Sequence, residues 1–214
     1  MVATKANHFV RIFGTVISTY TRIVEIACEE AGLCHETIAT PAQSPQNRHP
    51  FSKVPVVEVD GLELIESVAI TQYIDNAHNG GCLQPADPAK RAVMDKWIAV
   101  ANNYLFPLFE HGLVMPWIMH RVAGFDLDQE RIERALPNIS RSLGYLEAEM
   151  AQDGAWTATG DFTLADVFLY PILRGLQLTP QGQVGLAQCD HLSAWMAVSE
   201  NRPSIAATRW ESEP

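Results

Sequence analysis

The stretch VPVVEVDGLELIE, residues 54–66, constrains the fold more than any other part of the chain. On both sides of Asp60-Gly61, apolar residues alternate with polar ones, which is the pattern of two strands that each bury one face. Asp-Gly is favoured in the tight type I′ turn because both central residues of that turn take positive φ. The stretch therefore predicts a β-hairpin.

Upstream of the hairpin, strand and helix patterns alternate. FVRIF, residues 9–13, is a short apolar strand, and TRIVEIACEEAGL, residues 21–33, has helical spacing and ends near Gly32, which suits a helix C-cap. HETIAT, residues 35–40, predicts a second strand. The next ten residues, 41–50, hold three prolines and no apolar period, so we predict a loop.

A helix, SVAITQYIDNAH, follows the hairpin at residues 67–78, with Ser67 predicted at its N-cap. The resulting order of elements, β-α-β, loop, β-β-α, predicts a small mixed sheet with helices and resembles a thioredoxin-like domain.

The character of the chain changes after Gly80-Gly81. Asp87-Pro88 is an N-cap followed by proline at the first helical position, and helical periodicity continues from there. We find no strand-like alternation downstream, and six prolines punctuate five or six predicted helices, at positions 107, 116, 137, 171, 180 and 203. The sequence predicts domains at residues 1–80 and 88–214, joined by a linker at 81–87.

The charge balance excludes several classes of partner. The chain of 214 residues carries 15 basic and 25 acidic residues, a net charge of −10, without any basic run. A nucleic-acid backbone or an anionic membrane is therefore not an expected partner. Because no apolar run reaches the roughly 18 residues of a membrane span and the first residues lack the apolar core of a signal peptide, we expect a soluble cytoplasmic protein.

The four cysteines, Cys28, Cys34, Cys82 and Cys189, form no CxxC pair and show no zinc-ligand spacing. We therefore expect reduced thiols, without a disulfide framework, a metal or a dithiol redox motif. The sequence also lacks the GxSxG, Walker and GxGxxG motifs of hydrolases, phosphate-loop enzymes and dinucleotide enzymes.

Three stretches in order carry a family resemblance: GTVISTYTRIVEIACEEAGL at residues 14–33, PFSKVPVVEVDGLELIESVAITQYID at 50–75 and GDFTLADVFLYPIL at 160–173. Together they resemble the soluble glutathione transferases, in the serine-type, phi-like and related bacterial branch. The resemblance implies an α/β thioredoxin-like N-terminal domain with a mixed four-stranded sheet, followed by an all-α C-terminal domain. It also implies glutathione as co-substrate and a cytoplasmic homodimer.

The resemblance assigns glutathione contacts to the second stretch. It implies a cis Val54-Pro55 bond, with the valine backbone paired to the cysteinyl backbone of glutathione. It places Glu66 near the α-amino group, and the Ser67 hydroxyl and N–H on the γ-glutamyl carboxylate. Independently, unpaired N–H groups and the helix dipole at this helix start favour an anion, although Ser67 could also act only as a cap.

The glycyl carboxylate of glutathione is assigned less directly. Lys53 stands where the family has lysine or glutamine, and an ordinary solvated lysine is the alternative. The histidine that phi enzymes carry on their second helix has no clear counterpart here. His49 is the nearest candidate, and a surface histidine of the loop is the alternative.

A hydroxyl side chain is the candidate for activating the glutathione thiol. A thiol of pKa about 8.5 is only about 3% thiolate at neutral pH, and lowering its pKa by about 2 requires about 2.7 kcal/mol. A hydroxyl donor contributes roughly 1.5 to 3 kcal/mol and a helix N-terminus about 0.3 to 1 kcal/mol. The resemblance assigns this role to Ser18, with Thr15, Thr19 and Tyr20 as rivals. Reductase-like branches have cysteine here, whereas Cys28 falls mid-helix.

The resemblance leaves the electrophile open. Val16, Ile17, Met115 and Trp117 could line an apolar co-substrate site, or they could pack in the core or at a dimer seam. Phe51 stands where related classes place an aromatic that enters the partner subunit, with packing in its own loop as the alternative. Thr163 and Asp166 have the form of a capping box, so we assign Asp166 a structural role.

We therefore expect an enzyme that conjugates glutathione to electrophilic apolar small molecules. One alternative is a binding or docking module with the same fold and no turnover. Another is a glutathione-dependent lyase, isomerase or peroxidase with a dedicated substrate.

Overall fold

The computed structural model describes residues 8–153, 161–211 and 213. Residues 1–7, on which the expectation of no signal peptide rests, lie outside the described residues, as does Gly160 of the third motif. The chain forms two compact units, Met1–Gln84 with Arg202–Pro214, here the N-terminal unit, and Pro85–Asn201, here the helical unit. The domain boundaries at residues 80 and 88 stay a prediction, and the last residues of the chain fall in the N-terminal unit.

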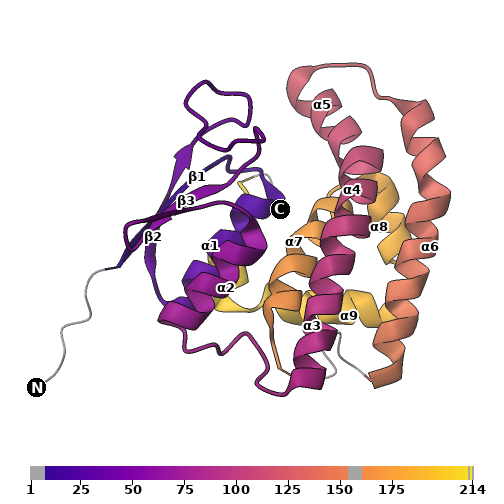
Figure 1. Ribbon diagram of the computed structural model, residues 1–214. Coiled ribbons are helices and arrows are strands. Elements are labelled where there is room, and N and C mark those ends of the chain that lie inside the picture. The colour runs from indigo at the N-terminus through magenta and orange to yellow at the C-terminus, as the bar shows by residue number, and fades with distance from the viewer. Residues whose placement is uncertain (1–7, 154–160, 212, 214) are drawn as a thin grey trace, which may run out of the picture. The chain divides into compact units, whose positions relative to one another are not determined.

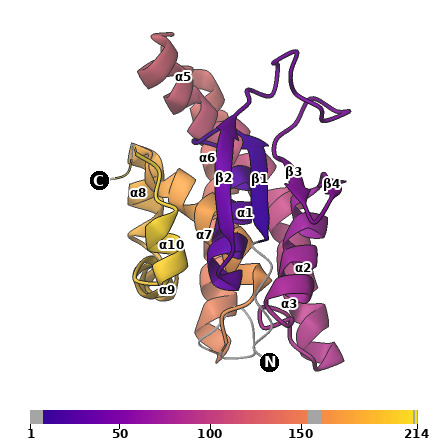
Figure 2. The same ribbon diagram turned by 90° about the vertical axis from the view of Figure 1, so that its left-hand side faces the viewer.

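The N-terminal unit contains a mixed four-stranded sheet in the order β2-β1-β3-β4, as predicted (Figure 2). Strand β1, Phe9–Gly14, pairs parallel with β2, Cys34–Ala39, and antiparallel with β3, Val56–Val59. Strand β4, Leu62–Leu64, pairs antiparallel with β3 across the Asp60-Gly61 turn. Both turn residues have positive φ, 50° and 78°, so the predicted hairpin is confirmed.

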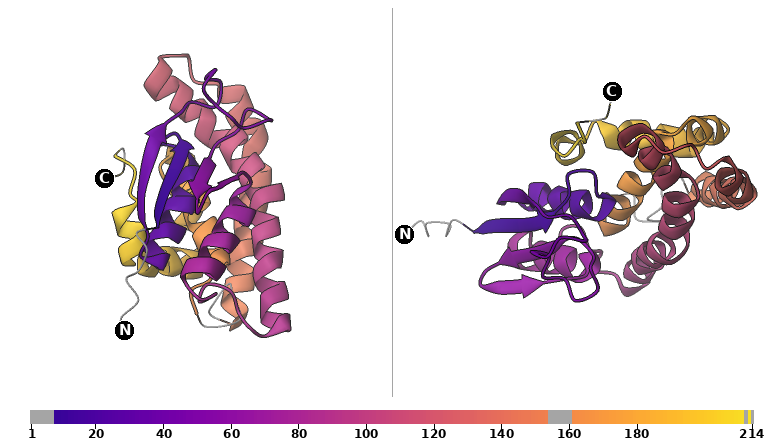
Figure 3. Two further views of the ribbon diagram at one scale, coloured as in Figure 1. Left: turned by 60° about the vertical axis from the view of Figure 1, so that its left-hand side comes forward. Right: turned by 90° about the horizontal axis from the view of Figure 1, so that it is seen from above.

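Two helices, α1, Thr19–Ala31, and α2, Ser67–His78, lie on the same face of this sheet (Figures 2 and 3). Alternate residues of β1, Val10 and Ile12, point to this face and form one fully buried cluster with Val24 of α1 and Ile70 of α2. Burying each such aliphatic side chain contributes about 1.5 to 3 kcal/mol to folding. This core holds the start of both helices at a fixed place against the sheet.

The other face of the sheet is polar. Residues 40–55, between β2 and β3, form the predicted loop without a helix. On this face Arg11 pairs with Glu36 and Glu58, and Arg48 from the loop also pairs with Glu58. The Arg48 guanidinium lies 4.2 Å from the ring centroid of Phe13, so it covers part of this apolar ring.

The end of the chain packs on α1. Helix α10, Pro203–Ala207, contacts α1, and Arg202 makes two hydrogen bonds of 2.6 Å to the carboxylate of Glu30. Beyond it, the fully buried Arg22 of α1 forms an ion pair with Glu213, and its guanidinium lies 4.6 Å from the ring centroid of Trp210. These contacts explain why residues 202–214 belong to the N-terminal unit.

The helical unit is all-α within its described residues, as predicted (Figure 1). Residues 88–123 are one uninterrupted helical run with two π-helical segments. The elements are α3 Pro88–Val100, η1 Ala101–Leu105, α4 Phe106–Phe109, η2 Glu110–Val114, α5 Met115–Ala123, α6 Gln129–Asp153, α7 Leu164–Gln177, α8 Pro180–Leu186 and α9 Asp190–Glu200.

Helix α7 is the core of the helical unit, because every residue from Leu164 to Leu176 is buried. The predicted capping box at its start is confirmed: Thr163 and Asp166 satisfy each other's backbone N–H groups. Our prediction that six prolines separate helices was wrong for four of them. Pro107 and Pro116 lie within the uninterrupted run of residues 88–123, Pro137 lies inside α6 and Pro171 inside α7. Packing around these helices outweighs the loss of one backbone hydrogen bond at each proline. Among the described residues, no helix is long and apolar enough to cross a membrane.

Candidate functional site

Three loops meet at one end of the sheet in the N-terminal unit. The register pairs Phe13 at the end of β1 with Val56 at the start of β3, and Val57 with Leu64 at the end of β4. The β1–α1 loop, the Val54-Pro55 bond and the β4–α2 connection therefore all leave the sheet at this end. These are the segments that carry Ser18, Val54 and Ser67.

Ser18 is the N-cap of α1. Its backbone is extended, with φ −79° and ψ 124°, and its Oγ accepts a hydrogen bond of 3.3 Å from the N–H of Thr21. Because a hydroxyl can accept and donate at once, this bond leaves the Ser18 O–H available as a donor. The side chain is half-buried. The structure thus places a hydroxyl donor at a helix N-terminus.

The rival hydroxyls are placed differently. Thr19 is buried, and the Oγ1 of buried Thr21 packs against Gly14, where an added Cβ would lie 2.3 Å from it. Thr15 and Tyr20 are half-buried, and the carbonyl of Thr15 accepts the N–H of Ser18 at 2.9 Å. Burial of Thr19 makes it a weaker candidate, whereas Thr15 and Tyr20 stay rivals of Ser18.

The Val54-Pro55 bond is cis, as the resemblance predicted. Within the part of the chain that the structure describes, the N–H and C=O of Val54 make no hydrogen bond. The preceding loop is organised by Asn47, whose side-chain amide donates to the carbonyls of Ala42 at 2.8 Å and Lys53 at 2.9 Å. Sequence reasoning missed this role of Asn47, although asparagine commonly bonds to nearby backbone in turns.

His49 and Lys53 differ in accessibility. The ring of His49 is buried, and its Nδ1 accepts the N–H of Phe51 at 3.2 Å. The alternative of a surface histidine is therefore wrong. The side chain of Lys53 is exposed. Only the lysine presents its charged group to solvent.

The connection from β4 to α2 has an unusual backbone. Glu66 has φ 69° and ψ 108°, a conformation that costs a non-glycine residue of order 1–3 kcal/mol. Our placement of Ser67 at the N-cap was wrong by one residue: Glu66 is the N-cap, makes no side-chain capping bond, and Ser67 begins the helix. The N–H groups of Ser67, Val68 and Ala69 bond to no described residue. They form an uncapped helix start that can receive an anion.

The electrostatics of this end of the sheet favour negative charge. Neither α1 nor α2 has an acidic residue in its first turn. Each helix N-terminus carries roughly half a positive charge. The starts of α1 and α2 thus present two helix dipoles at this end of the sheet, and the Glu66 carboxylate at the α2 N-cap adds one negative charge there. The arrangement suits a ligand that carries a carboxylate and a thiolate.

The candidate co-substrate residues lie on both units. Val16 and Ile17 are exposed apolar side chains in the loop directly before Ser18. In the helical unit Met115 is half-buried, and the Nε1 of Trp117 donates to Gln181 at 2.8 Å. The Arg121 guanidinium also lies 4.8 Å from the Trp117 ring centroid, so this ring has partners within its own unit.

The cysteines are free thiols. Cys28 is fully buried in α1, and burial, with the nearby Glu25 and Glu29, raises the pKa of its thiol far above the ordinary value. Such a thiol stays protonated and is a poor nucleophile. In α7, burial raises the pKa of Asp166, whose oxygens accept from Thr163 and from Trp195 Nε1 at 3.0 Å. Both residues have structural roles.

The fold and these loops define a thioredoxin-like sheet domain followed by a helical domain. Two family descriptions match: Glutathione S-transferase, N-terminal domain, over residues 12–82, and Glutathione S-transferase, C-terminal domain, over residues 129–197. Glutathione S-transferase F7 of Arabidopsis thaliana is 28% identical over 91% of this chain and 96% of its own. A glutathione S-transferase of Hyoscyamus muticus is 30% identical over 73% of each.

Among solved structures, glutathione S-transferase I from mais, in complex with an atrazine glutathione conjugate, superposes with a TM-score of 0.77. It is 28% identical and covers 95% of this chain and 99% of its own. The chain therefore belongs to the glutathione S-transferase family, and its relatives are of the plant phi-like type.

Proposed function

We propose that the protein is a glutathione transferase that joins the glutathione thiolate to electrophilic, apolar small molecules. The observation that carries the proposal is the meeting of three features at one end of the sheet: the Ser18 hydroxyl, the unpaired Val54 backbone and the uncapped start of α2. Glutathione offers a complementary group to each, namely a thiol, a peptide backbone and a γ-glutamyl carboxylate.

In the proposed complex, the α2 N-terminus and the Ser67 hydroxyl bind the γ-glutamyl carboxylate. In this complex the strained backbone of Glu66 orients the start of α2 towards the ligand. The Glu66 carboxylate then lies near the α-amino group of glutathione. The N–H and C=O of Val54 pair with the cysteinyl backbone. For the glycyl carboxylate we favour Lys53 over His49, because the lysine is exposed and the histidine ring is buried.

The Ser18 hydroxyl then donates a hydrogen bond to the glutathione sulfur. A bond to a charged group contributes roughly 1.5 to 3 kcal/mol, which lowers a thiol pKa by about one to two units. The thiol proton leaves to solvent, and the sulfur forms a C–S bond with the electrophilic carbon. Either a leaving group departs with the bonding electron pair, or a conjugated double bond opens and its other carbon takes a proton from solvent. No general base is required.

The electrophile would meet apolar surface next to the sulfur. Val16 and Ile17 supply exposed apolar side chains two residues and one residue before Ser18. That Met115 and Trp117 also line the co-substrate site stays a prediction from the sequence. Since the relative from mais was solved with an atrazine glutathione conjugate, atrazine is a suitable first electrophile.

We also propose a homodimer. Phe51 has 71% of its surface exposed, and its ring centroid lies 6.0 Å from that of His49 in the same loop. It follows the buried His49 in the loop that carries Lys53, so its backbone is held in place. We propose that a second subunit of the same protein buries the Phe51 side chain.

The test is the conjugation rate with glutathione and chlorodinitrobenzene. We expect Ser18→Ala to lower kcat/KM by about 10- to 150-fold, the equivalent of the hydrogen bond to sulfur. Thr15→Ala and Tyr20→Phe are the matched controls and should change it little. A wild-type protein that binds glutathione without any turnover would contradict the proposal, and loss of activity in one control instead would move the role away from Ser18.

A further inference from the structure

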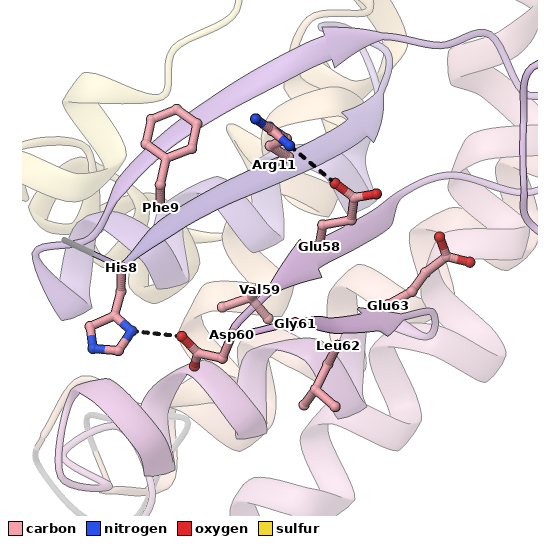
Figure 4. A pocket seen from close by; sticks show the side chains of 9 residues that line it. All are labelled: His8, Phe9, Arg11, Glu58, Val59, Asp60, Gly61, Leu62 and Glu63. Carbon is pink, nitrogen blue, oxygen red and sulfur yellow. Dashed lines mark hydrogen bonds and ion pairs between the residues drawn. The ribbon is translucent and has the colours of Figure 1, made fainter. Parts of the chain in front are cut away.

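At the opposite end of the sheet, three side chains from separate segments converge. His8 directly precedes β1, Asp60 lies in the β3–β4 turn, and His78 is the last residue of α2. His8 Nδ1 lies 2.6 Å from one carboxylate oxygen of Asp60, and His78 Nε2 lies 2.7 Å from the other. Figure 4 shows His8 directed at Asp60. Both residues line an open cavity of about 580 Å³. One potential ligand atom from each residue lies within 4.8 Å of the others.

We propose that His8, Asp60 and His78 form a binding site for a divalent transition-metal ion of the zinc type. Two imidazole nitrogens and one carboxylate oxygen are a donor set that zinc and its neighbours prefer over magnesium or calcium. Three protein ligands leave a fourth position for water, which matches a site that opens to solvent.

The geometry needs only a small adjustment. Ligands bound tetrahedrally at about 2.0 to 2.1 Å from one ion lie about 3.3 Å apart. The histidine nitrogens contact different oxygens of Asp60, at 2.6 and 2.7 Å. One ligand atom from each residue lies within 4.8 Å of the others, so the separations have to change by no more than about 1.5 Å to reach this spacing. The side chain of His8 is 41% exposed and can make that movement, whereas His78, 9% exposed, and Asp60, 23% exposed, form the more enclosed part.

The surroundings fix the carboxylate and the rings. The hydroxyl of Tyr73 donates to Asp60 Oδ2 at 2.8 Å, an outer contact of the kind that orients metal-binding carboxylates. The ring centroids of His8 and His78 lie 4.7 Å apart, and the Asp60-Gly61 turn holds the carboxylate at the tip of the hairpin. The site is therefore built on a strand end, a tight turn and a helix end.

This site is separate from the proposed glutathione contacts. His78 and Ser67 are the two ends of α2, about 16 Å apart along the helix axis. The proposal therefore does not depend on the catalytic assignment. It also explains why spacing rules for cysteines gave no sign of a metal, since the ligands are histidine and aspartate from segments far apart in sequence.

Calorimetric titration of the full chain with Zn²⁺, in buffer without glutathione, tests the proposal. We expect one ion per chain, and at least about tenfold weaker binding in both His78→Ala and Asp60→Asn. The matched control is His191→Ala, because His191 pairs with a single carboxylate, Glu147, at 2.8 Å and belongs to no metal-type cluster among the described residues. Its zinc affinity should equal that of the wild type.

Absorption spectra with Co²⁺ identify the ligands, since exposed Cys34 and Cys82 are competing donors. The proposal predicts visible bands without a thiolate-to-cobalt charge-transfer band, and loss of the visible bands in the two ligand variants. Circular dichroism checks that both variants are folded. Three results would overturn the proposal. They are the absence of one-to-one binding in the wild type, unchanged binding in both ligand variants, and a thiolate-to-cobalt charge-transfer band.

Discussion

Glu110 in η2 supports a prediction about stability and pH. Burial raises the pKa of Glu110 to about 7, and its carboxylate bonds to no described residue. Because an ordinary glutamate has a pKa of about 4.3, the folded protein keeps this proton at pH values where the unfolded chain has lost it. The stability that the protonated Glu110 carboxyl contributes to the folded protein is complete below about pH 4.3 and is lost as the pH rises towards 7.

The magnitude follows from the pKa difference. Each pKa unit corresponds to about 1.36 kcal/mol, so the free energy of unfolding should fall by up to about 4 kcal/mol across this window. Partial exposure of the side chain makes this an upper value. Glu110→Gln has a similar size and cannot ionise. The variant should match the wild type near pH 4.5 and exceed its stability by up to about 4 kcal/mol at pH 8.

Urea unfolding at several pH values between 4.5 and 8.5 measures this difference. Glu133→Gln, which changes an exposed glutamate on α6, is the control and should follow the wild-type pH profile. Parallel stability profiles for the wild type and Glu110→Gln would refute the reasoning, because they would mean that Glu110 is ionised in the folded protein at the same pH as in the unfolded chain.

Three other variants test the packing and assembly. Glu213→Ala leaves the buried Arg22 guanidinium without its carboxylate and should destabilise the N-terminal unit by about 3 to 5 kcal/mol in thermal unfolding, and an unchanged melting curve would contradict this. Gly14→Ala places a methyl group 2.3 Å from Thr21 Oγ1, so it should lower the free energy of unfolding by about 1 to 3 kcal/mol and also lower activity. Adding Thr21→Ala should restore part of the stability. Phe51→Asp should shift the protein from dimer to monomer on size exclusion at micromolar concentration, whereas a wild-type monomer would refute the dimer.

Local patterns predicted the parts of the fold that local physics decides. The Asp60-Gly61 turn, the capping box at Thr163 and the helix start at Asp87-Pro88 each depend on a few neighbouring residues, and the structure has all three. The cis Val54-Pro55 bond came from the family resemblance, because proline alone gives only a small preference for cis.

Long-range packing decided what the sequence could not show. The residue type of Glu66 gives no indication that its backbone takes a strained conformation with positive φ. The ion pair of Glu213 with Arg22 joins positions that are 191 residues apart in the sequence. Likewise His8 and His78 meet only because the register of the hairpin brings Asp60 between them. Local rules also failed at prolines inside buried helices, where tertiary packing outweighs helix propensity.

The central claim is that the Ser18 hydroxyl stabilises the glutathione thiolate. The most direct measurement is the near-ultraviolet absorbance of that thiolate, bound to the wild type and to Ser18→Ala, as a function of pH. The account predicts that the bound thiol in the wild type titrates about one to two units below a pKa of 8.5, and that the substitution removes most of this difference. A bound thiol with the same pKa in both proteins would contradict it.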